Sequence, residues 1–218
     1  MTVTLCLWAS AGPARLCLVE DDAILASADA GRDGPPDPIR GATLEQMTRA
    51  AMQDAGRQIL DIDRIAVDIG PGRLSAVRAA ASFANGLAFG LAKPMLPVVS
   101  SAVAGMAAAE AHDLPAIVVH KSAAGTAYVS RYRQGLETVR HGPLAEAFTH
   151  VTTGLTAFAL AGFAVTEAEA LAPTARITAA GDGIVTAEAF ARFVAADGAA
   201  FRPGPVIPCT EQSDLIDG

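Results

Sequence analysis

The chain has 218 residues, enough for one large domain or two small ones with a substantial core. Hydrophobic residues make up 51% of it and charged residues 18%, a composition that argues against a disordered chain. The formal net charge of −7 disfavours autonomous, nonspecific binding to a nucleic acid backbone, but it allows a role in RNA metabolism beside a basic partner.

The start of the chain and its cysteines indicate a cellular compartment. The first ten residues, MTVTLCLWAS, lack the basic region of a signal peptide and predict a strand. Three cysteines without such a signal, Cys6, Cys17 and Cys209, are typical of reduced thiols, so we expect a cytoplasmic protein. Cys6 and Cys17 would lie opposite each other if the intervening SAGP forms a hairpin; we expect buried thiols.

The first hundred residues predict the order β-β-β-α-β-α, closed by a further strand. Turn signals separate three short strands, over residues 3–9, 14–20 and 23–29, which predict an antiparallel meander. Thr43 and Gln46 make a capping box for a helix running to about residue 58. A strand over 63–69, a helix over 73–92, a strand over 95–100 and a helix over 100–111 follow. Right-handed crossovers then predict a mixed sheet, an order found in the actin and sugar kinase superfamily.

The second half begins again with strands, over residues 115–121, 126–133 and 137–140. About fifty Ala-rich residues then give no clear pattern. A strand over 175–183 ends in a glycine turn, a helix covers 186–195, and the Pro-rich tail from Phe201 is expected to lie extended on the surface. We therefore predict two compact α/β domains, 1–100 and 101–218.

The apolar helix over 74–92 could be mistaken for a membrane span. It contains Arg78 and Asn85, so we expect a buried or interface helix and no membrane partner.

The stretch DIGPGRLSAVR, residues 68–78, joins a strand to this helix and raises the question of phosphate binding. It lacks the Lys-Ser or Lys-Thr of a phosphate-binding P-loop, and Ser75 holds the third glycine position of a dinucleotide fingerprint. A tight turn explains Gly70 and Gly72. The alternative is an anion contact at the helix N-terminus. The candidate contacts are Ser10, Gly70, Gly72 and Arg73.

Other catalytic patterns are missing from the sequence. The histidines, His112, His120, His141 and His150, have no helical ligand spacing, so we expect no metal site. No G-x-S-x-G serine motif occurs, and we predict no catalytic residue. Asp61 and Asp63 could form an acid pair but are interpreted as solvated turn residues, and Asp182 between two glycines as a turn.

The helices over 43–58 and 74–92 predict a surface for another chain. The second helix is apolar on more than one face, and such a helix must be covered on both sides. The first helix alone could cover it; the alternative is an intermolecular bundle built by both helices. The predicted partner interface consists of Thr43, Leu44, Met47, Ala51, Val77, Ala81, Ala84, Asn85 and Ala88.

Residues 70–107, GPGRLSAVRAAASFANGLAFGLAKPMLPVVSSAVAGMA, resemble the signature of the TsaB (YeaZ) family. The family pattern is Gly-Pro-Gly-Ser-Phe-Thr-Gly-Leu-Arg, a small-residue helix, a proline, a Val-rich strand and a Ser-Ser helix start. The matching positions are Gly70, Pro71, Gly72, Arg78, Gly86, Leu87, Ala88, Pro94, Val99, Ser100 and Ser101. TAYVSRYR and AAGDG extend the resemblance more loosely.

The resemblance implies an actin-like (ribonuclease H-like) fold and a non-catalytic subunit. Such a subunit binds and supports TsaD, which installs threonylcarbamoyl on a tRNA adenosine, through its first two helices. It also helps to form the platform for the ATPase TsaE and self-associates when alone. The resemblance further implies that ATP or ADP could sit at the partner interface, and that tRNA is contacted only indirectly.

The chain departs from the family pattern after its first strand. Trp8-Ala9-Ser10 replaces the usual Asp-Thr-Ser, whose aspartate helps position a metal and nucleotide in the wider superfamily. Phosphate transfer depends on charge stabilisation around a metal, so we expect no ATP hydrolysis. Two alternatives stay open: a nucleotide-hydrolysing enzyme of the actin-like superfamily, and a degenerate homodimer that has lost the TsaD contact.

Overall fold

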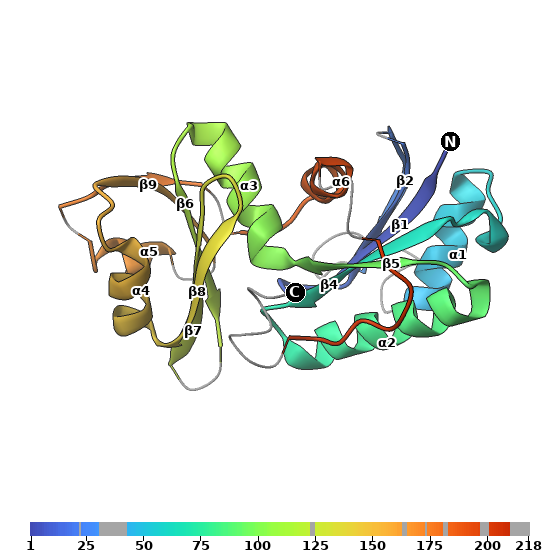
Figure 1. Cartoon of the computed structure of the whole chain (residues 1–218), viewed down its shortest axis with the longest axis horizontal. Helices are drawn as coiled ribbons and strands as arrows, with labels where there is room; N and C mark the ends of the chain where they lie inside the picture. Colours follow the sequence, from blue (N-terminus) through green and yellow to red (C-terminus); the bar gives the residue numbers. More distant parts are fainter. Residues whose placement is uncertain are drawn as a thin grey trace. The chain divides into compact units, whose positions relative to one another are not determined.

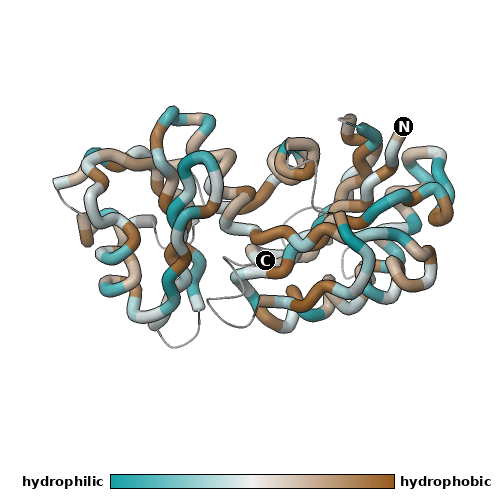
Figure 2. The backbone as a smooth tube through the Cα atoms, in the orientation of Figure 1, coloured by the Kyte–Doolittle hydropathy of each residue, from teal (hydrophilic) through white to brown (hydrophobic). Residues whose placement is uncertain are grey.

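The chain forms two α/β units, each built on a five-stranded mixed sheet (Figure 1). A computed structural model describes residues 1–21, 23–30, 43–122, 125–162, 165–172, 174–180, 183–196 and 201–209. Unit 1 comprises Met1–Ile69, Arg73–Val98 and Thr186–Pro208; unit 2 comprises Gly70–Gly72, Val99–Val185 and Cys209–Gly218. In Figure 2 the hydrophobic, brown stretches follow the strands of both sheets.

The sheet of unit 1 contains the predicted meander and crossovers. Its strands are β1 (Val3–Trp8), β2 (Arg15–Glu20), β3 (Ala23–Asp29), β4 (Arg64–Gly70) and β5 (Met95–Val99), in the order β3-β2-β1-β4-β5. Strand β1 pairs antiparallel with β2 and parallel with β4. Cys6 lies directly opposite Cys17, and both thiols are buried, as expected.

Two helices follow the meander in unit 1, and both end at left-handed residues. Helix α1 (Leu44–Asp54) begins with the predicted capping box: the amide of Gln46 donates to Thr43 Oγ1 and the amide of Thr43 donates to Gln46 Oε1. It ends earlier than expected because Gly56 adopts a positive φ of 64°. Helix α2 (Leu74–Leu91) stops at Ala92, with φ 52°.

The opposite face of this sheet is covered by a helix from the end of the chain. Helix α6 (Ala187–Ala196) contacts β2 and β3, and its Phe190 ring stacks on Trp8 with centroids 5.1 Å apart. Figure 1 shows α6 on one side of this sheet and α2 on the other. The predicted division at residue 100 lies beside the break at Val98. However, Thr186–Pro208 belongs to unit 1.

The extended residues after α6 attach to unit 1 at three points. We call Phe201–Val206 the C-terminal strap. Arg202 exchanges two backbone hydrogen bonds with Met95, each 2.9 Å long, and so covers the edge strand β5. The Asn85 amide donates to the Val206 carbonyl at 2.9 Å and accepts from the Val206 amide at 2.8 Å. The Arg64 guanidinium lies 4.4 Å from the Phe201 ring centroid.

Unit 2 has the strand order β10-β9-β6-β7-β8. The strands are β6 (Ala116–Lys121), β7 (Thr126–Tyr132), β8 (Leu136–Pro143), β9 (Ala157–Gly162) and β10 (Arg176–Ala179), and the helices are α3 (Ser100–His112), α4 (Leu144–Thr152) and α5 (Val165–Glu169). The Ala-rich stretch that gave no clear pattern contains α4, β9 and α5. Helix α3 packs tightly on the sheet: a Cβ at Gly105 would lie 2.6 Å from the Tyr132 Cβ.

Candidate functional site

The glycine-rich connection leads from β4 into α2. Gly70 has a φ of 109°, which side chains rarely adopt, so glycine is required there. The backbone amide of Arg73 donates to the Ser10 carbonyl at 3.1 Å, which ties the start of α2 to the turn after β1. Arg73 is exposed, Gly72 is half-buried and Ser10 is buried. Of the four predicted anion contacts, Gly72 and Arg73 are therefore the accessible ones.

A buried carboxylate that sequence reasoning missed lies beneath this turn. Asp68 Oδ2, in β4, accepts hydrogen bonds from the backbone amides of Ala9 at 3.2 Å and Ser10 at 2.9 Å. Asp68 is fully buried. The only hint in the sequence is a charged residue inside the apolar run IAVDIG. Because these two amides serve an internal carboxylate, they are not available to a phosphate.

The residue that replaces the family's aspartate is part of the core. Trp8 is 4% exposed and stacks on the fully buried Phe190. An apolar indole at this turn offers no charge to a metal ion. Within the residues that the structure describes, no group of three or more His, Cys, Asp or Glu could hold a metal.

The two aspartates before β4 each accept a backbone hydrogen bond. Asp61 Oδ2 accepts from the Gln58 amide at 2.7 Å, and Asp63 Oδ2 accepts from the Val3 amide at 2.9 Å. Asp61 thus holds the short turn before β4, and Asp63 ties that turn to the start of β1. Asp182, the other aspartate singled out in the sequence, lies outside the described residues.

The predicted partner interface is largely inside unit 1. Six of its nine residues are buried in the monomer: Met47, Ala51, Val77, Ala81, Ala84 and Ala88. They pack α1 and α2 on the sheet and are not accessible on the surface of the monomer. Thr43 is exposed, and Leu44 and Asn85 are partly exposed. The predicted residues of α2 lie mostly on the inner of its two apolar faces.

The other face of α2 is largely apolar and exposed. Among the described residues, Leu74–Leu91 is the one helix long and apolar enough to cross a membrane, yet only 28% of it is buried. Phe89 is 91% exposed. The outward side of helix α1 is more polar, since it carries the Glu45–Arg49 ion pair beside the partly exposed Leu44. The α2 outer face consists of Leu74, Ser75, Arg78, Ala79, Ser82, Gly86, Phe89 and Gly90. Apart from Arg78 and the two small serines, its members are apolar.

A groove lies between the last turns of α2 and the C-terminal strap. Its volume is about 910 Å³. We call it the strap groove; its lining is Asn85, Gly86, Ala88, Phe89, Ala92, Lys93, Pro94, Met95, Pro203, Gly204 and Pro205. Most of these side chains are apolar, so the α2 outer face continues into a hollow that suits an apolar side chain.

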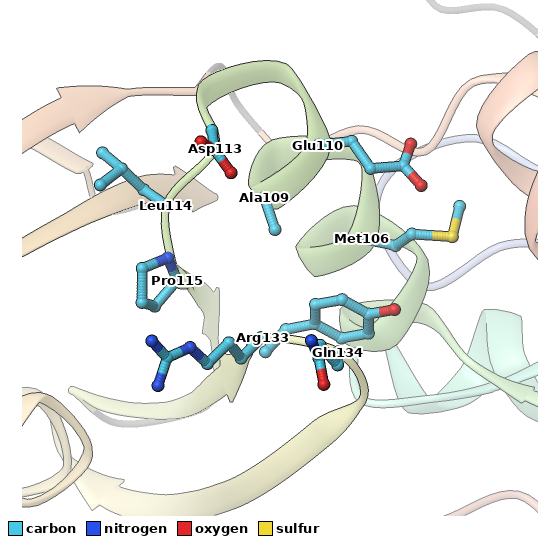
Figure 3. Close-up of a pocket in the computed structure, with 9 residues that line it drawn as sticks. Met106, Ala109, Glu110, Asp113, Leu114, Pro115, Arg133 and Gln134 are labelled. Atoms are coloured by element: carbon cyan, nitrogen blue, oxygen red, sulfur yellow. The ribbon is translucent and has the colours of Figure 1, made fainter.

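Unit 2 has a cavity of its own, of about 520 Å³ (Figure 3). Met106, Ala109 and Glu110 of α3 form one wall, and Arg133 and Gln134 lie across from them. The cavity is open and mixed in charge, and it contains none of the predicted contacts.

Comparisons of the sequence with known proteins identify one family. A family model described as "TsaD: tRNA N6-adenosine threonylcarbamoyltransferase" matches residues 41–191. A protein of that name from Chromobacterium violaceum is 46% identical over 52 residues, which are 24% of this chain and 15% of the relative. Another from Jannaschia sp. is 43% identical over 56 residues, 26% of this chain and 16% of the relative. The matched segments thus span about a sixth of these relatives.

Two solved structures from Pseudomonas aeruginosa share the fold. One is described as an uncharacterized protein with similarity to peptidase YEAZ; it has a TM-score of 0.72 and 20% identity, covering 96% of this chain and 100% of that one. The other, described as YeaZ, has a TM-score of 0.65 and 20% identity, covering 91% and 94%. The likeness confirms the actin-like α/β fold and the YeaZ resemblance predicted from the sequence.

Proposed function

We propose, because the chain belongs to the TsaD (tRNA N6-adenosine threonylcarbamoyltransferase) family, that it is a non-catalytic subunit of the tRNA threonylcarbamoyladenosine machinery. In this role it binds and supports a TsaD-like catalytic subunit in the cytoplasm and contacts tRNA only indirectly. A TsaE-like ATPase, with ATP or ADP at the partner interface, completes the assembly.

The exposed, largely apolar face of α2 is the observation that carries this proposal. Burying a phenylalanine side chain contributes about 1.5–3 kcal/mol, so leaving Phe89 in water is costly. An exposed apolar helix face marks a protein–protein contact. The proposed contact surface is therefore the α2 outer face with the strap groove, which Asn85 also lines; Thr43 and Leu44, at the start of α1, are the other accessible residues of the predicted interface.

The turn after β1 supports a non-catalytic role. Phosphoryl transfer relies on a metal and on groups that neutralise developing charge. Trp8 supplies neither, and Asp68 Oδ2 is engaged by the Ala9 and Ser10 amides. Gly72 and Arg73 remain as surface contacts for a nucleotide phosphate held by both partners.

Co-purification with the TsaD-like protein of the same organism tests the proposal. We expect a stable complex for the unaltered chain and its loss in Phe89→Asp, because a carboxylate would be buried against apolar surface. Leu60→Asp is the matched control, since Leu60 is also exposed, at 74%, but lies outside α2. No association in any nucleotide state would contradict the proposal.

Self-association is a second candidate, favoured by the presence of Phe89 and the strap groove on one surface. An exposed ring beside an apolar hollow is compatible with a symmetric homodimer. Light scattering at several concentrations, with and without the TsaD-like protein, separates the two. A dimer that persists when the TsaD-like protein is added would favour the homodimer.

A further inference from the structure

We infer that Cys6 and Cys17 are a modification site, at which a low-molecular-weight disulfide such as oxidised glutathione generates a reversible bond between the two sulfurs. Helix α6 controls this reaction, because it covers the face of the sheet on which both thiols lie. That face is the one away from α2 (Figure 1), and the inference does not depend on the proposed function. Disulfides of cytoplasmic proteins are usually transient and redox-sensing.

The two cysteines form a hydrogen-bonded pair of the β1–β2 ladder. They are direct partners in the antiparallel register. In the same register the Asp21 amide donates to the Thr2 carbonyl at 3.1 Å, and every second pair along an antiparallel ladder is of the same type. The Cα atoms of such a pair are about 5.5 Å apart, which is within the range that a disulfide spans. The strands can therefore carry the bond without a change of register.

The bond is expected to be easily reduced. Facing Cβ atoms of an antiparallel pair lie about 4.5–5.5 Å apart, whereas a disulfide holds them at about 3.5–4.5 Å. Oxidation must therefore draw the two side chains together, which strains the ladder. Strained disulfides have higher reduction potentials and belong to the labile, regulatory kind.

Helix α6 lies over the thiol pair. The side chains of Cys6, its partner Cys17 and Trp8 point to one face of the sheet, because pairing is direct and alternate residues share a face. Trp8 stacks on Phe190, and Cys17 Sγ lies 4.0 Å from the carbonyl oxygen of Ala187, where α6 begins. Both thiols are fully buried. A hydrogen bond with Cys17 and burial raise the pKa of Cys6, so Cys6 stays an unreactive thiol while α6 is in place.

The thiol pair lies one strand away from the edge of the sheet. Its neighbours in the same row have small side chains: Ser27, opposite Cys17 on the edge strand β3, and Ala66, beside Cys6 on β4. Ser27 is exposed. Once α6 lifts, a reagent therefore reaches the sulfurs without displacing a large side chain from this row.

The reaction consists of two thiol–disulfide exchanges. The Cys17 thiolate attacks one sulfur of oxidised glutathione, and one reduced glutathione leaves. The Cys6 thiolate then attacks the Cys17 sulfur of the mixed disulfide, and a second reduced glutathione leaves. Two electrons and the two thiol protons thus end on the released glutathione, and the chain becomes about 2 Da lighter.

Oxidation and the docking of α6 oppose each other. The disulfide has no thiol hydrogen, so Cys17 can no longer donate to the Ala187 carbonyl at the start of α6. The reduced chain therefore holds α6 more firmly than the oxidised chain does, and by linkage a docked α6 disfavours the disulfide. Trp8 is the one tryptophan of the chain, and it stacks on α6 beside the thiols, so its fluorescence reports the change.

Oxidation of the full chain carrying Cys209→Ser tests the inference, since that substitution removes the third thiol. The protein is incubated with oxidised glutathione at about pH 8, alkylated and weighed without reduction. We expect a chain about 2 Da lighter with no alkylated thiol, restored by dithiothreitol, together with a reversible change in Trp8 fluorescence. The control with Cys6→Ser added cannot close the bond and should never show this product.

A second comparison tests control by α6. Phe190→Leu weakens the packing of α6 and should speed formation of the bond on the order of tenfold, because the open form becomes more populated. Phe148→Leu is the matched control and should leave the rate unchanged, since Phe148 is equally buried and packs edge-on against Phe158 within unit 2.

A faster reaction in Phe190→Leu alone supports both parts of the inference. Thiols that stay reduced until urea unfolds the chain would overturn it, as would a reaction that stops at the mixed disulfide. Equal rates for Phe190→Leu and Phe148→Leu would overturn the role of α6. Each of these outcomes leaves the proposed function untouched, because none involves the TsaD-like protein.

Discussion

Individual polar residues are buried inside the strands of both sheets. Asp68 fixes the turn after β1, and His120 in β6 is 1% exposed. Burial lowers the pKa of His120 to about 4, because the imidazolium form loses its hydration. From the sequence, a lone histidine is expected to be either a buried core residue or a surface residue. Only the position of β6 in the sheet decides between the two. The consequence is an acid-sensitive core.

We predict that the free energy of unfolding falls as the pH drops from about 6.5 to 4. Over this range His120 binds a proton in the unfolded chain but stays neutral in the folded one. The folded pKa lies below the unfolded one, so the contribution is fully present above about pH 6.5; it is lost toward pH 4 and amounts to about 3 kcal/mol. Urea unfolding of His120→Leu should show a shallower pH slope than the unaltered chain. His150→Leu, on the exposed side of α4, is the control. Equal slopes for His120→Leu and the unaltered chain would contradict this.

At the scale of helices and strands, signals between neighbouring residues predicted the structure correctly. The apolar pattern on two faces of one helix did not. The capping box at Thr43 and the antiparallel register of Cys6 with Cys17 follow from neighbouring residues, and both were predicted. The buried face of α2 was not, because apolar periodicity cannot decide between two apolar faces. Small side chains let the inner face of α2 approach the sheet closely, but the outer face carries small residues too, so only the contacts with the distant strand β1 decide between them.

Close approach also predicts opposite effects for two glycine-to-alanine substitutions. Gly105→Ala would place a Cβ 2.6 Å from the Tyr132 Cβ, which is fixed by its strand, so α3 must shift at a cost of about 1–3 kcal/mol. A Cβ at Gly86 meets nothing within 4 Å, and Gly86→Ala should gain about 0.5–1 kcal/mol of helix stability. Urea midpoints measure both. A stabilised Gly105→Ala variant would show that α3 is not packed in this way.

At the scale of the whole chain, unit 1 is discontinuous. Its sheet comes from the first half of the sequence, but α6 and the C-terminal strap come after unit 2. The sequence-based division at residue 100 missed this. Which unit a segment belongs to depends on contacts between residues far apart in the sequence, such as Trp8 with Phe190 and Asn85 with Val206. No window of neighbouring residues contains such pairs.

Truncation after Val185 should therefore expose the sheet face that α6 covers. In the full chain we expect Cys209 to react readily with a thiol reagent, and Cys6 and Cys17 to be protected, since a Cys17 hydrogen bond and burial raise the pKa of Cys6. In the truncated chain both remaining thiols should react. Truncation after Pro208 is the control and should keep them protected. Protected thiols in the shorter chain would show that α6 is dispensable.

The late return of α6 also has a consequence during synthesis on the ribosome. The strands of unit 1 are complete at Val99, but their covering helix starts at Ala187, roughly 90 residues later. At translation rates of roughly 5–20 residues per second, one side of the nascent sheet stays bare for about 5–20 s. The nascent chain thus exposes a hydrophobic sheet face, which includes Trp8, to molecular chaperones before α6 is synthesised.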